Sequence, residues 1–141
     1  MPETQVEQKQ TGKETNLQVS LAPFLDRLKE LAQLEADWDS YGAEPISSIA
    51  LVASFELLDS IKERLSKKVG ELLPQFVAPL ADGGIQMEWS RLRGDIEVEI
   101  SPAGDFNYLL IEGQEPNRKF EEKHQISLEE VLNLLSQFLI F

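Results

Sequence analysis

The sequence predicts a single α+β domain: two N-terminal helices, an antiparallel meander of four to five strands, and a C-terminal helix. Three observations predict this class. Apolar residues recur at helical spacing in the first half of the chain, whereas they alternate with polar residues after Pro74. Asp82-Gly83 and Pro102-Ala103-Gly104 are hairpin-turn signals between the alternating runs. Ser127 and Glu130 form a capping box that begins the last helix. We expect the helices to cover one face of the sheet.

The chain has 141 residues, of which 42% are hydrophobic, and this is enough for one domain with its own core. We expect the domain to span residues 20–141. Residues 1–19 are rich in Gln, Glu, Thr and Lys and lack apolar periodicity, so we expect them to form a disordered tail.

Two helices are predicted before the strands. The first is expected over Leu21–Asp37, with Ser20 as its N-cap and Trp38 completing its apolar face. The second is expected over Ser48–Lys68, with Ser47 as its N-cap. Its buried face is predicted from residues at helical spacing, namely Leu51, Phe55, Leu58, Ile61 and Leu65.

A two-residue type I′ turn at Asp82-Gly83 is predicted to join the first two strands. Pro79 lacks the N–H that an inner strand needs, so the first strand is expected at an edge of the sheet. The turn would place six side chains on the core face by pairing Leu80 with Ile85, Ala78 with Met87, and Phe76 with Trp89.

The third strand is predicted over Asp95–Ser101, and a three-residue loop with Gly104 in the left-handed region joins it to the fourth. This loop would pair Ile100 with Phe106 and Val98 with Tyr108, so that the apolar residues again share one face. A short fifth strand is expected at Lys119–Lys123.

The last helix is apolar on nearly all sides between Leu132 and Phe141. Such a helix is usually buried on more than one side. Two arrangements are open at this point. The helix could be clamped between the sheet and the other helices, or it could form the contact of a homodimer.

Three glutamates are predicted on the face of the sheet that is turned away from the core. Glu88, Glu97 and Glu99 alternate with core residues, and Glu88 would lie opposite Glu97 or Glu99. Leu109 and Ile111 are predicted beside them. This face could be a solvated surface, a docking surface for a basic protein, or a carboxylate cluster for a divalent metal or acid–base chemistry. A flat, mixed apolar and acidic surface is more typical of an interface than of an active site, which needs a partly dry cavity.

The loop between the two helices resembles a calcium loop only in part. Asp37, Asp39 and Gly42 match the first, third and sixth positions of an EF-hand loop. Ser48 stands at the twelfth position, where calcium requires a bidentate Glu. The sequence therefore predicts no calcium site here.

The same loop has a structural interpretation. Gly42 would supply a turn, and Asp39 or Ser40 would accept hydrogen bonds from nearby backbone N–H groups. Tyr41 and Glu44 have no such role, so we predict that they contact a ligand or a protein partner.

The charge and composition exclude several classes of function. With 13 basic against 25 acidic residues the net charge is -12, which disfavours nucleic acid and anionic membranes and favours a basic protein partner. The chain has no cysteine, so thiol catalysis and thiolate metal sites are excluded. His124, the single histidine, is expected to be exposed rather than catalytic. We expect a cytoplasmic protein that uses no cofactor.

Two segments carry a resemblance to a known family. The first is W-D-S-Y-G-A-E-P-I-S at residues 38–47, and the second is D-G-G-I-Q-M-E-W at residues 82–89. Together they resemble a family of short, uncharacterised bacterial proteins that pair a W-D-x-Y-G-A-x-P loop with a D-G-G-[IV]-x-[LM]-E-W hairpin. The resemblance covers Leu28 to Leu110. It implies a bacterial origin and one compact unit, and it assigns no catalytic residue.

The sequence therefore favours a non-enzymatic, acidic protein-binding module that acts as an adaptor, a chaperone or an antitoxin-like neutralising partner. Its expected partner-binding residues are Glu88, Glu97, Glu99, Leu109, Ile111, Tyr41 and Glu44. The alternative is a metal-assisted or acid–base enzyme that uses the clustered carboxylates. No catalytic residue or metal ligand is assigned.

Overall fold

The computed structural model describes residues 21–65 and 72–140. The predicted tail at residues 1–19, its neighbour Ser20, and the predicted end of the second helix at Lys68 lie outside these residues. The described elements follow the order α2 (Ala22–Ala32), α3 (Ser48–Arg64), β1 (Phe76–Pro79), β2 (Ile85–Arg91), β3 (Gly94–Ile100), β4 (Phe106–Glu112), β5 (Lys119–Ile126) and α5 (Leu128–Ile140).

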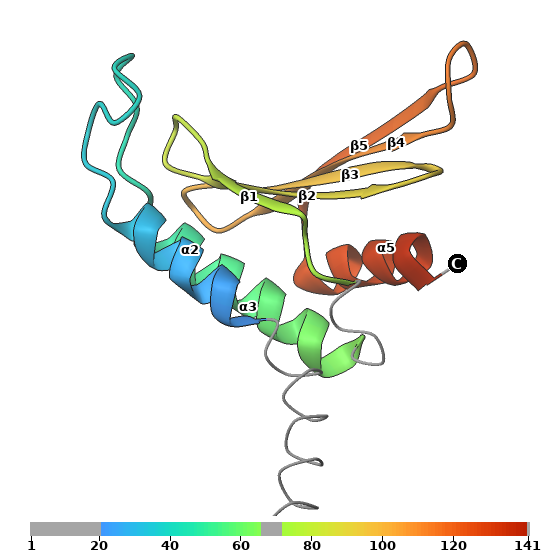
Figure 1. The fold of residues 1–141 in the computed structure, drawn as a ribbon, viewed down its shortest axis with the longest axis horizontal. Helices are drawn as coiled ribbons and strands as arrows, with labels where there is room; N and C mark the ends of the chain where they lie inside the picture. The colour runs from blue at the N-terminus through green and yellow to red at the C-terminus, as the bar shows by residue number, and fades with distance from the viewer. Residues whose placement is uncertain (1–20, 66–71, 141) are drawn as a thin grey trace, which may run out of the picture.

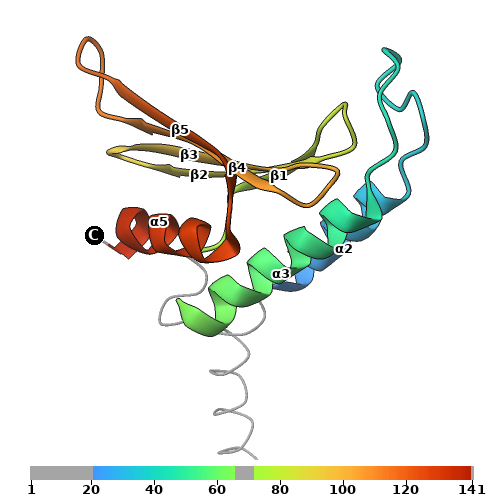
Figure 2. The same ribbon diagram turned by 180° about the vertical axis from the view of Figure 1, so that it is seen from behind.

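The strands form one antiparallel meander in the order β1-β2-β3-β4-β5. The helices lie together on one side of this sheet, and the opposite side is open (Figure 1). Figure 2 shows that the α2–α3 loop and the β4–β5 connection both extend on the open side, near opposite ends of the sheet. The predicted α+β architecture is confirmed, including the fifth strand and the position of β1 at an edge.

The core lies between the sheet and the helices because alternate strand residues carry large apolar side chains. Trp89 is fully buried, and its indole Nε1–H donates to the carbonyl oxygen of Leu72 at 2.9 Å. This bond satisfies the polar group of the largest core side chain. The strand residues that are 0% exposed are Ile85, Met87, Trp89, Ile96, Val98 and Ile100.

The first hairpin differs from the prediction by one residue. Gly83 N–H donates to Leu80 O at 3.0 Å, and Leu80 N–H donates to Gly84 O at 2.9 Å. The loop therefore has three residues, Ala81 to Gly83, and Gly83 takes a φ of +94°. It is a type I turn followed by a left-handed glycine, not a type I′ turn. The pairs are Phe76 with Glu88, Val77 with Met87, Ala78 with Gln86 and Pro79 with Ile85.

This difference of one residue reverses the faces of β1. Val77 is buried, whereas Phe76 is 63% exposed. The prediction that Phe76 faces the core opposite Trp89 is therefore wrong.

The second hairpin has the predicted loop. Gly104 N–H donates to Ser101 O at 2.8 Å, and Ser101 N–H donates to Asp105 O at 2.9 Å. Ile100 pairs with Phe106 and Val98 with Tyr108, as predicted.

Helix α2 ends at Ala32, so the prediction that it continues to Asp37 and carries Trp38 on its apolar face is wrong. Its N-cap is Leu21, without a side-chain cap, in place of the predicted Ser20. The N–H groups of Gln33 and Leu34 donate to Glu30 O and Leu31 O, three residues back, and these tighter bonds close the helix. Asp37 then belongs to the loop, where its N–H donates to Ala43 O at 2.7 Å.

Helix α3 begins as predicted, since the Ser47 hydroxyl accepts from the N–H groups of Ile49 and Ala50. Its buried face is rotated from the predicted one, however. The fully buried residues include Ala50, Ser54, Leu57, Leu58 and Ile61, whereas Phe55 is 43% exposed. The buried residues of this helix therefore include two small ones, Ala50 and Ser54, besides the larger Leu57, Leu58 and Ile61.

The capping box of α5 is confirmed. Glu130 N–H donates to the Ser127 hydroxyl at 3.1 Å, and Ser127 N–H donates to the Glu130 carboxylate at 3.4 Å. The helix packs against β4 and α3, which buries Val131 and Leu135 completely. This packing accounts for an apolar surface on more than one side and corresponds to the clamped arrangement.

Candidate functional site

The open face of the sheet is built from cross-strand rows, because residues paired across antiparallel strands point to the same side. In the central row Glu88 lies directly opposite Glu97, which is one of the two predicted pairings. This row continues from Phe76 on β1 to Leu109 and Glu122 on β4 and β5. The rows on either side are Ala78, Gln86, Glu99 and Asn107, and Ser90, Asp95, Ile111 and Phe120.

The structure therefore brings together five of the predicted site residues on one face: Glu88, Glu97, Glu99, Leu109 and Ile111. It adds three that the sequence did not identify. Phe76 is turned outward by the register of the first hairpin. Phe120 and Glu122 belong to β5, where nearly every residue is polar. The sequence of this strand therefore does not show which of its side chains face the core and which face solvent.

Glu97 is the carboxyl group most affected by this arrangement. Burial raises its pKa, and the neighbouring carboxylates of Glu88, Glu99 and Asp95 raise it further. The charged form of Glu97 is therefore disfavoured by acidic neighbours on its own strand and on β2. Glu88 accepts a hydrogen bond from the Gln86 side-chain amide at 2.7 Å, which partly satisfies its carboxylate.

Beside this row the face has a shallow cavity of about 100 Å³. It is lined by Glu97, Glu99, Asn107, Tyr108, Leu109, Glu122 and His124. His124 is exposed, as predicted. The cavity places acidic and apolar side chains next to each other near β5.

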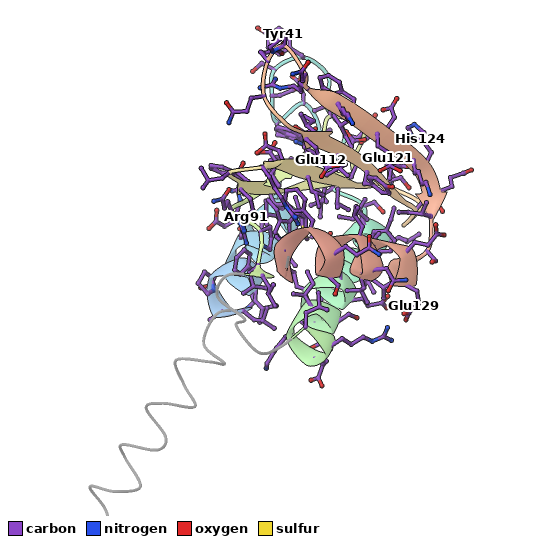
Figure 3. All side chains as sticks on the ribbon, turned by 90° about the vertical axis from the view of Figure 1, so that its right-hand side faces the viewer. Tyr41, Arg91, Glu112, Glu121, His124 and Glu129 are labelled. Carbon is purple, nitrogen blue, oxygen red and sulfur yellow. The ribbon has the colours of Figure 1, made fainter. Side chains whose placement is uncertain are left out.

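The α2–α3 loop holds Tyr41 at its outermost end (Figure 3). The Tyr41 side chain is 92% exposed. Beneath it the Asp39 carboxylate accepts from the N–H groups of Tyr41 and Ala43, and the Asp37 carboxylate accepts from Gly42 N–H at 2.7 Å. These bonds support the predicted turn and present the tyrosine on an ordered loop.

The base of this loop is tied to the first hairpin. The Trp38 indole donates to Glu44 O at 2.7 Å, and Glu44 N–H donates to Ala81 O at 2.8 Å. Ser47 N–H donates to Gly83 O at 2.9 Å. Glu44 thus has a structural role through its backbone, while its side chain is exposed.

The loop carboxylates are occupied by backbone donors, consistent with a turn rather than a cation site. Within residues 21–65 and 72–140, no group of three or more His, Asp or Glu side chains is placed to hold a metal ion. No helix in these same residues combines the length and apolar character that crossing a bilayer requires.

No protein-family model, curated protein or solved structure matches this chain.

Proposed function

We propose that this chain is a non-enzymatic protein-binding module, and that the open face of its sheet binds a basic protein. The observation that carries the proposal is the central row, in which Glu88 faces Glu97 across the β2–β3 pair and Leu109 follows on β4. Like charges directly opposite each other destabilise a sheet. A cationic partner would remove this repulsion, because its ammonium or guanidinium groups would pair with both carboxylates.

The exposed apolar side chains of the same face support this proposal. Phe76 and Phe120 are 63% and 64% exposed and lie on β1 and β5, on either side of the acidic centre. Aromatic side chains are the anchors that interfaces favour, and an acidic centre selects for positive charge. The partner expected from this surface is a basic protein segment with apolar residues among its cations.

The cellular role in this proposal is that of an adaptor, a chaperone or an antitoxin-like neutralising partner. A cytoplasmic location is part of the proposal. Membership in the bacterial family that the two motifs resemble is also part of it.

The test is recovery of the partner from the native host with three versions of the chain. The first is the wild type, and the second carries Glu88→Gln, Glu97→Gln and Glu99→Gln. The third is a matched control with the same change in net charge on exposed positions of helices α2 and α3: Asp26→Asn, Glu56→Gln and Glu63→Gln.

We expect the wild type and the control to recover the same protein, and the sheet-face variant to lose it. Equal recovery by all three would remove the open face as the binding surface. Loss with both variants would show that net charge, rather than this face, attracts the partner.

The second candidate is acid–base chemistry at Glu97, which its raised pKa favours. Glu97 stands on an open sheet face, however, and not in a deep cavity. A thermal-shift screen with calcium, magnesium and manganese tests the metal-assisted version, since a bound ion would raise the unfolding temperature.

A further inference from the structure

The two edge strands of the sheet differ in whether a further strand can pair with them. Strand β1 has four residues and ends at Pro79, which has no N–H to donate. The Arg27 side chain of α2 reaches this edge, and its Nε–H donates to Val77 O at 3.0 Å. A short strand, a proline and a side chain on the backbone carbonyl together close the β1 edge to further pairing.

Strand β5 forms the other edge and has eight residues. Its residues from Lys119 to Gln125 are all exposed. The edge is therefore longer than that of β1 and open to solvent along most of its length. Its charged side chains oppose indiscriminate strand pairing, as is usual for edges, but they do not block the backbone.

The hydrogen-bond pattern indicates which backbone groups of β5 face outward. Ser101, directly after β3, donates its N–H to Asp105 O. Because hydrogen-bonded pairs alternate along an antiparallel ladder, every second residue of β3 counted back from Ser101 bonds to β4. The remaining β4 residues then bond to β5, through the pairs Tyr108–Lys123, Leu110–Glu121 and Glu112–Lys119. The N–H and C=O groups of Phe120 and Glu122 consequently point away from β4, toward the open edge. The same rule turns Val77 toward the outside of β1, where Arg27 binds its carbonyl.

There is room for side chains on the helical side of this edge. A groove of about 460 Å³ lies between the outer hairpin and α5. Its lining includes Tyr108, Leu110, Glu121 and Lys123 from the strands and Leu134 and Phe138 from α5. Figure 3 shows Glu121 and His124 on this hairpin. A further strand beside β5 could place every second side chain in this groove.

The open side of the same edge selects for charge. Glu122 is the last member of the central acidic row and lines the small cavity with Glu97 and Glu99. Phe120, in the next row, is exposed beside Ile111. A strand next to β5 would thus place its open-face side chains near Glu122 and Phe120, where lysines offer an ammonium group to the carboxylate and an apolar stem to the ring, while its apolar side chains face the groove.

We propose that β5 is an acceptor edge, on which an extended basic segment of a protein partner adds as a sixth strand. The inference rests on the proposed function and supplies its binding mode. Backbone hydrogen bonds from Phe120 and Glu122 give affinity, and the carboxylates of the open face give selectivity for cations. A second copy of this chain is the competing occupant.

The probe is a short synthetic peptide that alternates lysine and valine, with both ends blocked. A second peptide has the same side chains but an N-methyl group on every backbone nitrogen, so it cannot donate along either edge. Binding is followed by the amide resonances of the full chain and by calorimetry. We expect the unmodified peptide to shift the Phe120 and Glu122 amides most and to slow their hydrogen exchange.

The chain variants separate backbone pairing from charge. Glu122→Pro removes an outward N–H without removing a bond to β4, and Glu122→Gln removes the charge alone. We expect Glu122→Pro, or the methylated peptide, to weaken binding about tenfold, as expected for a lost backbone hydrogen bond, and Glu122→Gln to have a smaller effect. The methylated peptide makes the test independent of how the proline variant folds.

Strand addition is overturned if the methylated peptide binds as well as the unmodified one, or if the β5 amides do not respond. In either case the proposed function stands or falls separately, on recovery of the native partner by the Glu88, Glu97 and Glu99 variant. A dimer that forms without peptide and is lost in Glu122→Pro would assign the edge to a second copy, and this would also overturn the proposal.

Discussion

The two faces of the sheet are made by the same strands but differ in what their side-chain pairs contribute to stability. On the inner face Trp89 pairs with Ile96, and both are 0% exposed. On the outer face, one residue back along β2, Glu88 pairs with Glu97. The inner pair gains free energy from burial, whereas the outer pair loses some through repulsion. Folding therefore accounts for the inner face and not for the outer one.

This difference indicates what each face is for. Any small polar residue in place of Glu88 or Glu97 would serve folding better than a second carboxylate. Proteins commonly give up stability at binding sites in return for function. We therefore attribute the acidic row to recognition, and its cost can be measured.

The largest effect should come from the inner face. Trp89→Ala removes the largest buried side chain and its hydrogen bond to Leu72 O, and should lower the free energy of unfolding by about 3–5 kcal/mol. Urea denaturation measures it. Leu109→Ala on the outer face is the matched truncation and should cost much less. Similar costs for the two would show that the outer face is packed as tightly as the inner one.

A smaller effect is expected from the inner side of α3. Ser54 is fully buried, and within the described residues its hydroxyl has no hydrogen-bond partner. Ser54→Ala should raise the free energy of unfolding by about 1 kcal/mol, because it removes an unsatisfied polar group and favours the helix. A loss of stability in the same denaturation experiment would mean that the hydroxyl does have a partner.

The smallest effect on stability is expected at Glu97. Its pKa is raised in the folded chain by burial first and by Glu88, Glu99 and Asp95 next. The folded chain therefore binds this proton more tightly than the unfolded chain does. The resulting stability is present below the ordinary value of 4.5 and is lost as the pH rises through the raised pKa.

Glu97→Gln should accordingly stabilise the fold at about pH 7 by a few tenths of a kcal/mol, as expected for a half-buried like-charge pair that solvent partly screens. The difference from the wild type should shrink as the pH falls below 4.5. Unfolding curves at several pH values measure it. A variant that is less stable than the wild type near neutrality would show that Glu97 is favourably paired.

The two glycine loops show how far the sequence could predict the fold. Both are three-residue loops that end in a left-handed glycine, at Gly83 and Gly104. In the second loop Pro102 follows Ser101 directly and sets the start of the turn, so the register was predictable. In the first loop Asp82-Gly83 fits two turn types. The observed three-residue loop is accompanied by contacts from the distant α2–α3 loop, such as the hydrogen bond from Ser47 N–H to Gly83 O. The local sequence of the hairpin does not show these contacts.

The candidate site, like the two loops, was predictable from the sequence only in part. Glu88, Glu97 and Glu99 follow from the alternation of polar and apolar residues in β2 and β3. Phe76 faces outward only because the first hairpin has the longer loop. Glu122 joins the acidic row only through the pairing of β5 with β4, and the polar sequence of β5 does not show which of its residues share a face.

In the proposed function, the outer face binds its partner through charge. The most direct measurement is the dissociation constant of the recovered complex at about 0.05 M and about 0.5 M salt, where screening differs strongly. We expect the wild-type complex to weaken as salt rises, and the Glu88, Glu97 and Glu99 to Gln variant to bind weakly at both concentrations. A wild-type affinity that does not change with salt, or that the variant retains, would contradict it.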